Sequence, residues 1–585
     1  MLKTLFKQTK GVRLISVLTP LCMIGEVIME MIVPRLMSSI IDDGVTAGNM
    51  QHIYTVGGWM ILAAIVGLVF GVGGAVFGSA AATGLARNLR KSMFANIQTF
   101  SFANIDKYST AGLVTRMTTD VTNIQNAYQM SLRMSIRAPA SLIVAMVMSF
   151  AINRQLASIY LAAAILLACV LVFIMSHATR YFDQAFHRYD DLNESVQENV
   201  SAIRVVKAYV REKFEGEKFR KASEALRSLF MRAELILSWN SPAMMLTVYS
   251  CILLISWFGA RMIISSGATA FTTGELMSML AYCMNILMSL MMLSMVFVMI
   301  SMSAASAHRV AEVLDEKSDL HDPEEPVMEV KNGAVEFDHV CFRYKKDGRD
   351  VLSDINLNIR SGETIGIIGG TGSAKSSLVQ LLPRLYDVSA GHVRIGGIDV
   401  RNYDLEVLRN SVAMVLQKNE LFSGTIAENL RWGNEHATQE ELEEACRQAC
   451  ADEFIERFPD KYETHIEQGG TNVSGGQKQR LCIARALLKK PKILILDDST
   501  SAVDTATDAK IRKSFADKIP GTTVFIIAQR ISSVENADHV LVLDGGKVSG
   551  YGTPAEMLAT NKIYQEVYNS QKQGGGDFDE KGGEA

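Results

Sequence analysis

The stretch that decides the fold of the C-terminal half is ETIGIIGGTGSAKSSLVQLL, residues 363–382. It reads as a short strand rich in β-branched residues, a glycine-rich turn from Gly369, and a helix that begins at Lys375 and ends before Pro383. In this context backbone N–H groups close around phosphate groups, a lysine supplies positive charge, and the next hydroxyl is available to Mg²⁺. The sequence therefore predicts a phosphate-binding loop within an α/β domain.

The candidate phosphate contacts form one short run. They are Gly369, Thr371, Gly372, Ser373, Ala374, Lys375, Ser376 and Ser377. Within the run, the Ser376 hydroxyl is the candidate Mg²⁺ ligand. Ala374 departs from the pattern G-x-x-x-x-G-K-[ST], because alanine stands where the last glycine belongs. An alanine permits the loop if its φ angle is negative, so we expect phosphate binding to be retained.

A second motif, KILILDDSTSAVD (492–504), reads as a buried strand that ends in two carboxylates. Asp497, at the strand end, is placed to hold Mg²⁺, and Asp498 is placed to polarise an attacking water. Because both motifs occur in order within one α/β unit, we expect this domain to bind ATP and Mg²⁺ as its cofactors.

Between these motifs lies NVSGGQKQRLCIARALL (472–488), a glycine turn at the start of a helix. With this segment the chain resembles the ATP-binding cassette (ABC) family, in its bacterial multidrug-exporter branch. The family signature LSGGQ is represented here by Val473, Ser474, Gly475, Gly476 and Gln477. The resemblance implies further site residues, namely Tyr344 for adenine stacking, Gln417 as a Mg²⁺ and catalytic contact, and Asp504 in the D-loop.

Two more positions depart from the family pattern. The family normally has Glu after the Mg²⁺-binding aspartate and a late His as a switch, whereas this chain has Asp498 and Gln529. Shortening the acidic side chain withdraws the carboxylate by roughly 1.5 Å, and a misplacement of about 1 Å can cost ~100-fold in rate. A weak catalytic side with a nearly intact signature resembles one half of a heterodimeric exporter, whose partner is a second, different half-transporter. Drift in a slow homodimer is the alternative.

The N-terminal half contains six apolar windows long enough to cross a lipid bilayer. They lie near 14–40, 53–83, 127–152, 156–177, 237–264 and 275–303. Basic residues gather in the long segments 84–126 and 178–235, which places these segments, both termini and the C-terminal domain on the cytoplasmic side of a cell membrane. We expect the long segments to be helical extensions with breaks at Ala111-Gly112 and Glu215-Gly216; solvated loops are the alternative.

The predicted fold class is a multi-domain membrane protein with a six-helix all-α transmembrane domain and an α/β P-loop nucleotide-binding domain. The expected boundaries are 1–315 for the transmembrane domain, 316–333 for a linker, 334–570 for the nucleotide-binding domain and 571–585 for a disordered tail. A net charge of −4, from 58 Lys and Arg against 62 Asp and Glu, excludes the bulk basic footprint of a nucleic-acid binder.

Two features of the membrane half concern its cargo. Glu26 and Glu30 lie four residues apart in the first span and are candidates for attracting cationic cargo; an ion pair with Arg35, or hydrogen bonding within the bundle, is the alternative. A methionine stripe in the sixth span suits ligands of varied shape, although packing is the alternative. Its candidate residues are Met284, Met288, Met291 and Met295. The expected function is ATP-driven export of hydrophobic or amphipathic compounds; lipid or peptide export and a nucleotide-gated regulatory subunit are the alternatives.

Overall fold

The computed structural model describes residues 2–345, 347–498, 505–519 and 521–573. Contacts divide the chain into two units, one formed by Met1–Gln98 and Ser109–Glu316, the other by Thr99–Tyr108 and Lys317–Ala585. The short segment Thr99–Tyr108 was expected in the membrane half, but it packs with the second unit. From residue 317 the predicted linker also belongs to that unit.

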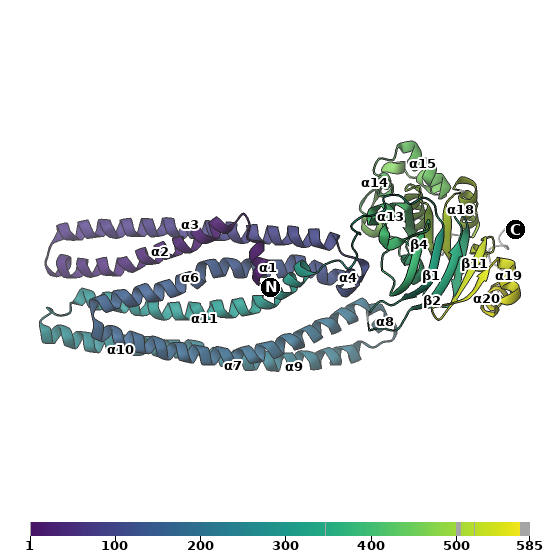
Figure 1. The fold of residues 1–585 in the computed structure, drawn as a ribbon. Helices are drawn as coiled ribbons and strands as arrows, with labels where there is room; N and C mark the ends of the chain where they lie inside the picture. Colours follow the sequence, from purple (N-terminus) through teal and green to yellow (C-terminus); the bar gives the residue numbers. More distant parts are fainter. Residues whose placement is uncertain (1, 346, 499–504, 520, 574–585) are drawn as a thin grey trace. The chain divides into compact units, whose positions relative to one another are not determined.

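The first unit consists of long helices that pack against one another along their lengths (Figure 1). They are α2 (Arg13–Ser39), α3 (Met50–Gln98), α6 (Val121–Ile152), α7 (Arg154–Ser201), α9 (Glu212–Ser238), α10 (Asn240–Ser266) and α11 (Thr273–Asp315). Shorter elements are α1 (Leu2–Lys7), α5 (Thr110–Thr115), α8 (Ile203–Ala208) and the π-helical turns η1 (Ile40–Thr46) and η2 (Arg116–Asp120). Among the described residues, six stretches are long and apolar enough to cross a membrane, which confirms the six predicted spans.

Polar groups inside this bundle pair with main-chain carbonyls that helices leave available. The buried hydroxyl of Tyr160 donates to the carbonyl of Met279 at 2.6 Å, and that of Tyr282 donates to the carbonyl of Met31 at 2.8 Å. In an apolar surrounding an unpaired hydroxyl would cost several kcal/mol, about 2 or more. These bonds therefore fix the register of α11 against α2 and α7.

Both predicted helix breaks are misplaced. Ala111 and Gly112 lie inside α5, because the Ser109 side chain accepts from the Gly112 amide and starts the helix before them. The interruption instead contains α4 (Phe102–Lys107), capped by Ser101. Glu215-Gly216 lies in the first turns of α9, where acidic residues favour a helix start.

The second unit is an α/β domain with two main sheets. Its strands are β1 (Val335–Phe342), β2 (Leu352–Ile359), β3 (Thr364–Gly369), β4 (Ala390–Ile395), β5 (Ile398–Asp399), β6 (Val412–Val415), β7 (Gly424–Thr425), β8 (His465–Ile466), β9 (Ile493–Asp497), β10 (Thr523–Ile527), β11 (His539–Asp544) and β12 (Lys547–Gly552). Its further helices are α12 (Lys375–Gln380), α13 (Leu405–Ser411), α14 (Ile426–Arg431), α15 (Gln439–Gln448), α16 (Asp452–Ile455), α17 (Gly475–Leu487), α18 (Thr505–Lys518), α19 (Pro554–Thr560) and α20 (Lys562–Gln573). The sheet orders are β2-β1-β4-β5, all antiparallel, and β12-β11-β3-β10-β9-β6, parallel except for β12.

Strand β9 shows why the larger sheet sits in the middle of this unit. Its residues are all buried, and they alternate between two cores. Ile493 and Ile495 face the core shared with the antiparallel sheet, whereas Leu494 and Leu496 face the core under the helices. A strand buried on both faces needs a continuous apolar run, which is what the sequence has.

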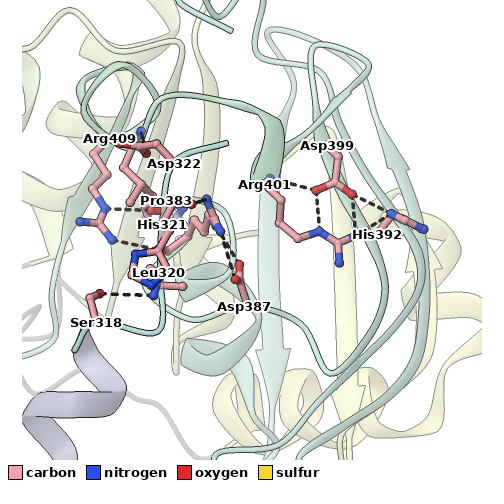
Figure 2. A network of polar contacts seen from close by, with 12 residues as sticks. Ser318, Leu320, His321, Asp322, Pro383, Asp387, His392, Asp399, Arg401 and Arg409 are labelled. Carbon is pink, nitrogen blue, oxygen red and sulfur yellow. Dashed lines mark hydrogen bonds and ion pairs between the residues drawn. The ribbon is translucent and has the colours of Figure 1, made fainter. Parts of the chain in front are cut away.

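The stretch after residue 317 is held on the surface of the second unit (Figure 2). The Arg384 guanidinium donates to the carbonyl of His321 at 3.2 Å, and the Asp322 carboxylate accepts from the Leu405 amide at 3.0 Å. Val327 then forms an isolated parallel β-bridge with Tyr403. At the other end α20 continues to Gln573, so the first residues of the predicted tail are helical, and the remainder lies outside the described residues.

Candidate functional site

The candidate site lies where parallel strands end. The phosphate loop follows β3, while Gln529, Asp497 and Gln417 come at or just after the carboxyl ends of β10, β9 and β6, which are successive neighbours in the sheet. In parallel α/β sheets, ligands bind outside these carboxyl ends. The topology therefore gathers residues from four separate segments at one edge.

Lys375 is folded into the loop that precedes it. Its ammonium donates to the carbonyl oxygens of Gly369 and Gly370, each at 2.9 Å. Burial lowers the pKa of Lys375, against the opposing effect of Asp497 and Asp498. A phosphate anion entering the loop would attract this half-buried cation away from two neutral acceptors.

The expectation of a negative φ at Ala374 is wrong. Ala374 has φ 70° and ψ 24°, in the left-handed region, immediately before α12 begins. Glycine adopts this conformation readily, whereas an L-residue is disfavoured there by about 1–2 kcal/mol. The loop therefore has the backbone that the missing glycine would take, and Ala374 carries strain.

Ser376 and Asp497 form the candidate Mg²⁺ site. The Ser376 hydroxyl donates to Asp497 Oδ1 at 2.9 Å. Burial raises the pKa of Asp497, and the hydrogen bond from Ser376 only partly offsets this effect. Hydroxyl and carboxylate oxygens are the ligands that Mg²⁺ prefers, so the pair fits the ion. Gln417 is exposed, two residues beyond the end of β6.

The two catalytic departures contact each other. Gln529 Nε2 donates to Asp498 Oδ2 at 2.7 Å, and the main-chain carbonyl of Gln529 accepts from Gln571 Nε2 at 2.8 Å. Asp498 has φ 46°, a second left-handed residue at this site. The carboxylate that would orient water is thus engaged by a neutral amide, which cannot become a cation.

Tyr344 lies beside the phosphate loop. Its hydroxyl is 2.8 Å from the Ser377 hydroxyl, and its ring meets that of Tyr386 edge-on at 5.2 Å. The Tyr386 hydroxyl in turn donates to Asp106 of α4 at 2.6 Å. Neither Tyr386 nor α4 could be predicted from the sequence, because only the folded chain shows that residues 99–108 pack with this unit.

The signature begins α17. Ser474 is the N-cap, its side chain accepts from the Gln477 amide, and the Gln477 side chain accepts from the Ser474 amide at 2.9 Å. Gly475 and Gly476 form the first helical positions, where unpaired N–H groups favour an anion. The predicted D-loop contact Asp504 lies outside the described residues.

In the first unit, both candidate carboxylates pair with an arginine that the sequence analysis did not single out. Arg137 Nη1 donates to Glu26 at 2.6 Å, and Arg137 Nη2 donates to Glu30 at 3.0 Å. Arg35, the partner considered from sequence, instead lies 3.4 Å from Glu275. The sequence does contain a clue to this pairing, because Arg137 is a basic residue within the apolar window 127–152.

The candidate methionines lie on an exposed face of α11 in this single chain. Met284, Met288, Met291 and Met295 are 48%, 52%, 41% and 64% exposed. A cavity of about 500 Å³ lies instead between α7 and α11. Its apolar wall includes Leu171, Val172, Met175, Leu290, Leu293 and Phe297.

Comparison with known proteins agrees with this architecture. The sequence profile of the ABC transporter transmembrane region matches residues 17–291, and that of the ABC transporter domain matches residues 352–501. The uncharacterized ABC transporter ATP-binding protein YfiB of Bacillus subtilis is 35% identical over 96% of this chain and 97% of its own length. The chain belongs to the ABC transporter family. Membership of the ABC transporters implies that the second unit binds and hydrolyses ATP.

Other relatives carry more specific names. The probable multidrug resistance ABC transporter YheI of Bacillus subtilis is 31% identical over 93% of both chains. The ATP-dependent lipid A-core flippase of Desulfotalea psychrophila is 32% identical over 83% of this ABC transporter and 84% of its own length. A solved structure of a bacterial Atm1-family ABC exporter with ATP bound superimposes with a TM-score of 0.79 over 97% of this chain and 98% of that one, at 24% identity. This likeness confirms the predicted fold.

Proposed function

We propose that this ABC transporter is one half of a heterodimeric exporter and that its own catalytic side is degenerate. The contact that carries the proposal is the 2.7 Å hydrogen bond between Gln529 and Asp498. A shortened carboxylate held by an amide is poorly placed to activate water, and misplacement by about 1 Å can cost ~100-fold in rate. The strained Ala374 is a third departure around the same nucleotide.

The signature motif, in contrast to the catalytic residues, is nearly intact. In the pairing that we propose, each ATP lies between the phosphate loop of one chain and the signature of the other. Ser474 and Gly476 would then serve the partner's competent site, while Asp498 and Gln529 would serve the weak one. The regular cap of α17 supports this division, because it presents the signature amides in an ordered helix start.

The proposed cargo is a set of hydrophobic or amphipathic compounds, moved out across the cytoplasmic membrane of a bacterium, with both termini cytoplasmic. The apolar cavity between α7 and α11 supports this cargo, and so does the similarity to a probable multidrug resistance protein. Closure of the paired ATP-binding domains on ATP would turn the membrane cavity from inward-facing to outward-facing. The docking of α4 on the second unit through Asp106 and Tyr386 offers a route for transmitting it.

The first test measures ATP turnover by the purified chain alone and after co-expression with its partner. We expect little turnover alone and restoration in the pair. Robust, cooperative turnover by this chain alone would refute the heterodimer.

The second test compares Ser474→Arg with Asp498→Asn in the assembled pair. Hydrogen bonds to a charged group contribute roughly 1.5–3 kcal/mol, and each 1.36 kcal/mol is tenfold in rate, so Ser474→Arg should reduce turnover by about a hundredfold. Asp498→Asn should reduce it much less, because it alters the weak site. Thr438→Arg is the matched control, since Thr438 caps α15 in the same manner away from the signature. If Asp498→Asn were the more damaging change, the two sites would be assigned the wrong way round.

A further inference from the structure

The first unit contains a second cavity, of about 570 Å³, between α2 and α3. The space exists because the facing wall of α3 is made of small residues, including Ala63, Ala64, Gly67, Gly71 and Ala75. At Gly71 an added Cβ would lie 3.2 Å from Glu26 Oε1. The small residues on this face of α3 therefore leave space, and Gly71 has no side chain to contact the Glu26 carboxylate.

Three ionisable groups line this cavity, and their charges do not cancel. Arg137 bridges Glu26 and Glu30, so one guanidinium faces two carboxylates. When all three groups are ionised, their charges sum to −1. Glu26 Oε2 is buried and has no hydrogen-bond partner, and the Glu30 side chain is 42% exposed. The cavity thus has a net negative charge that Arg137 does not neutralise, and the Glu30 carboxylate is the part of it that is exposed.

The position of the cavity makes this imbalance costly. Glu26 is the midpoint of α2, which runs from Arg13 to Ser39, so it lies roughly 20 Å from either helix end. A charged side chain near the centre of a bilayer costs about 2.5–3.5 kcal/mol or more, and such residues default to functional candidates. A further positive charge in the cavity would reduce this cost.

A nearby arginine does not supply that charge. Arg133 lies one turn from Arg137 on α6, and its side chain lies beside Gly78 of α3. Gly78 is seven residues along α3 from Gly71, the glycine beside Glu26, which corresponds to roughly 10 Å. Arg133 is not among the residues that line the cavity.

We propose that this cavity, defined by Glu26, Glu30, Arg137 and the small-residue face of α3, binds the positively charged group of a monovalent, amphipathic organic cation. The role of this cation as exported cargo rests on the proposed function, whereas its binding to the cavity does not. The charged centre of the ligand lies against the exposed edge of Glu30, on the side that faces Glu26. Its apolar groups lie along Ala63, Gly67 and Val72, none of which has a polar side chain.

The test measures equilibrium binding to the full chain in lipid nanodiscs. The probes are tetraphenylphosphonium, a lipophilic monovalent cation, and triphenylphosphine oxide, its neutral counterpart. Glu26→Gln should weaken binding of the cation by about tenfold, the loss of one favourable charge contact, and leave the neutral probe unchanged. Equal affinity of wild type and variant for the cation would overturn the proposal, as would a parallel loss of both probes.

Two further variants guard against trivial results. Glu275→Gln is the matched control, because Glu275 also pairs with an arginine in the first unit but does not line the cavity. It should leave binding of both probes unchanged; a loss equal to that of Glu26→Gln would count against the site. Gly71→Leu fills the cavity without removing a charge and should weaken binding of the cation. Retention of full affinity in Gly71→Leu would place the binding site elsewhere.

The experiment separates this proposal from the proposed function. If tetraphenylphosphonium binds as predicted but neither stimulates ATP turnover nor is moved by the reconstituted pair, the site stands and the export function fails for this cargo. If the pair transports neutral amphipathic compounds while the cation shows no dependence on Glu26, the export function stands and the site fails.

Discussion

Replacement of Ala374 by glycine should stabilise the second unit. Ala374 has φ 70°, where an L-residue carries about 1–2 kcal/mol of strain that glycine does not. The greater backbone freedom of glycine in the unfolded chain subtracts about 0.5–1 kcal/mol. Near the middle of both ranges, the net effect is a gain of about 0.5–1 kcal/mol in the free energy of unfolding.

Amide hydrogen exchange of the buried strand β9 measures this gain. Because β9 is paired on both sides, with β10 and with β6, and is buried on both faces, its amides exchange when the whole unit opens. A gain of 0.5–1 kcal/mol corresponds to exchange that is about two- to fivefold slower. Since the loop already has the left-handed conformation, the affinity for ATP should change by less than about threefold.

The matched control is Ala509→Gly in α18, the same chemical change at an exposed helical position. Glycine in a helix is less favourable than alanine by about 1 kcal/mol, so this variant should exchange faster. Opposite signs in the two variants would support the strain at Ala374. If Ala374→Gly also accelerated exchange in β9, the reasoning would be wrong.

Three more outcomes follow from contacts in the second unit. Lys375→Ala should weaken nucleotide occupancy at the weak site yet leave some transport by the pair; complete loss of ATP turnover with normal assembly would contradict the assignment. Tyr386→Phe removes the hydrogen bond to Asp106, so exchange of the α4 amides should accelerate by about fivefold, while unchanged exchange would show that the bond is unimportant. Burial raises the pKa of Asp399, but hydrogen bonds from Arg401 and His392 outweigh it and lower the pKa to about 2 (Figure 2). Because this value lies below the unfolded value of about 3.9, the carboxylate stabilises the unit above about pH 4, and the contribution is lost as pH falls towards 2. Asp399→Asn should reduce that part of the acid sensitivity, measured as an acid-unfolding midpoint.

Local chemistry made most of the second unit predictable. The run from Ile493 to Asp497 is apolar and ends in carboxylates, which defines both a buried strand and its functional end. The glycine turn before Lys375 defines a strand–loop–helix in the same way. In each case neighbouring residues in the sequence determine the structure, so no long-range information is needed.

The remaining features depend on packing between distant segments. The pairing of Arg137 with Glu26 requires the register of α6 against α2, which residue spacing within one helix does not contain. The φ angle of Ala374 is set by how β3 and α12 are joined, and residue type alone suggested the commoner negative value. The break near α4 was misplaced because Gly112 was weighted above the capping serines Ser101 and Ser109, and the break near α8 was misplaced because Gly216 was weighted above the acidic residues that begin α9.

The chain passes between its two units at three places, after Gln98, after Tyr108 and after Glu316. Two units joined by one covalent connection can rotate freely relative to each other, whereas three connections also restrict that rotation. One of these links ends α3, a continuous helix of 49 residues and roughly 70 Å. A force on the second unit would therefore act through this connection on the end of a long helix, without an irregular linker between them.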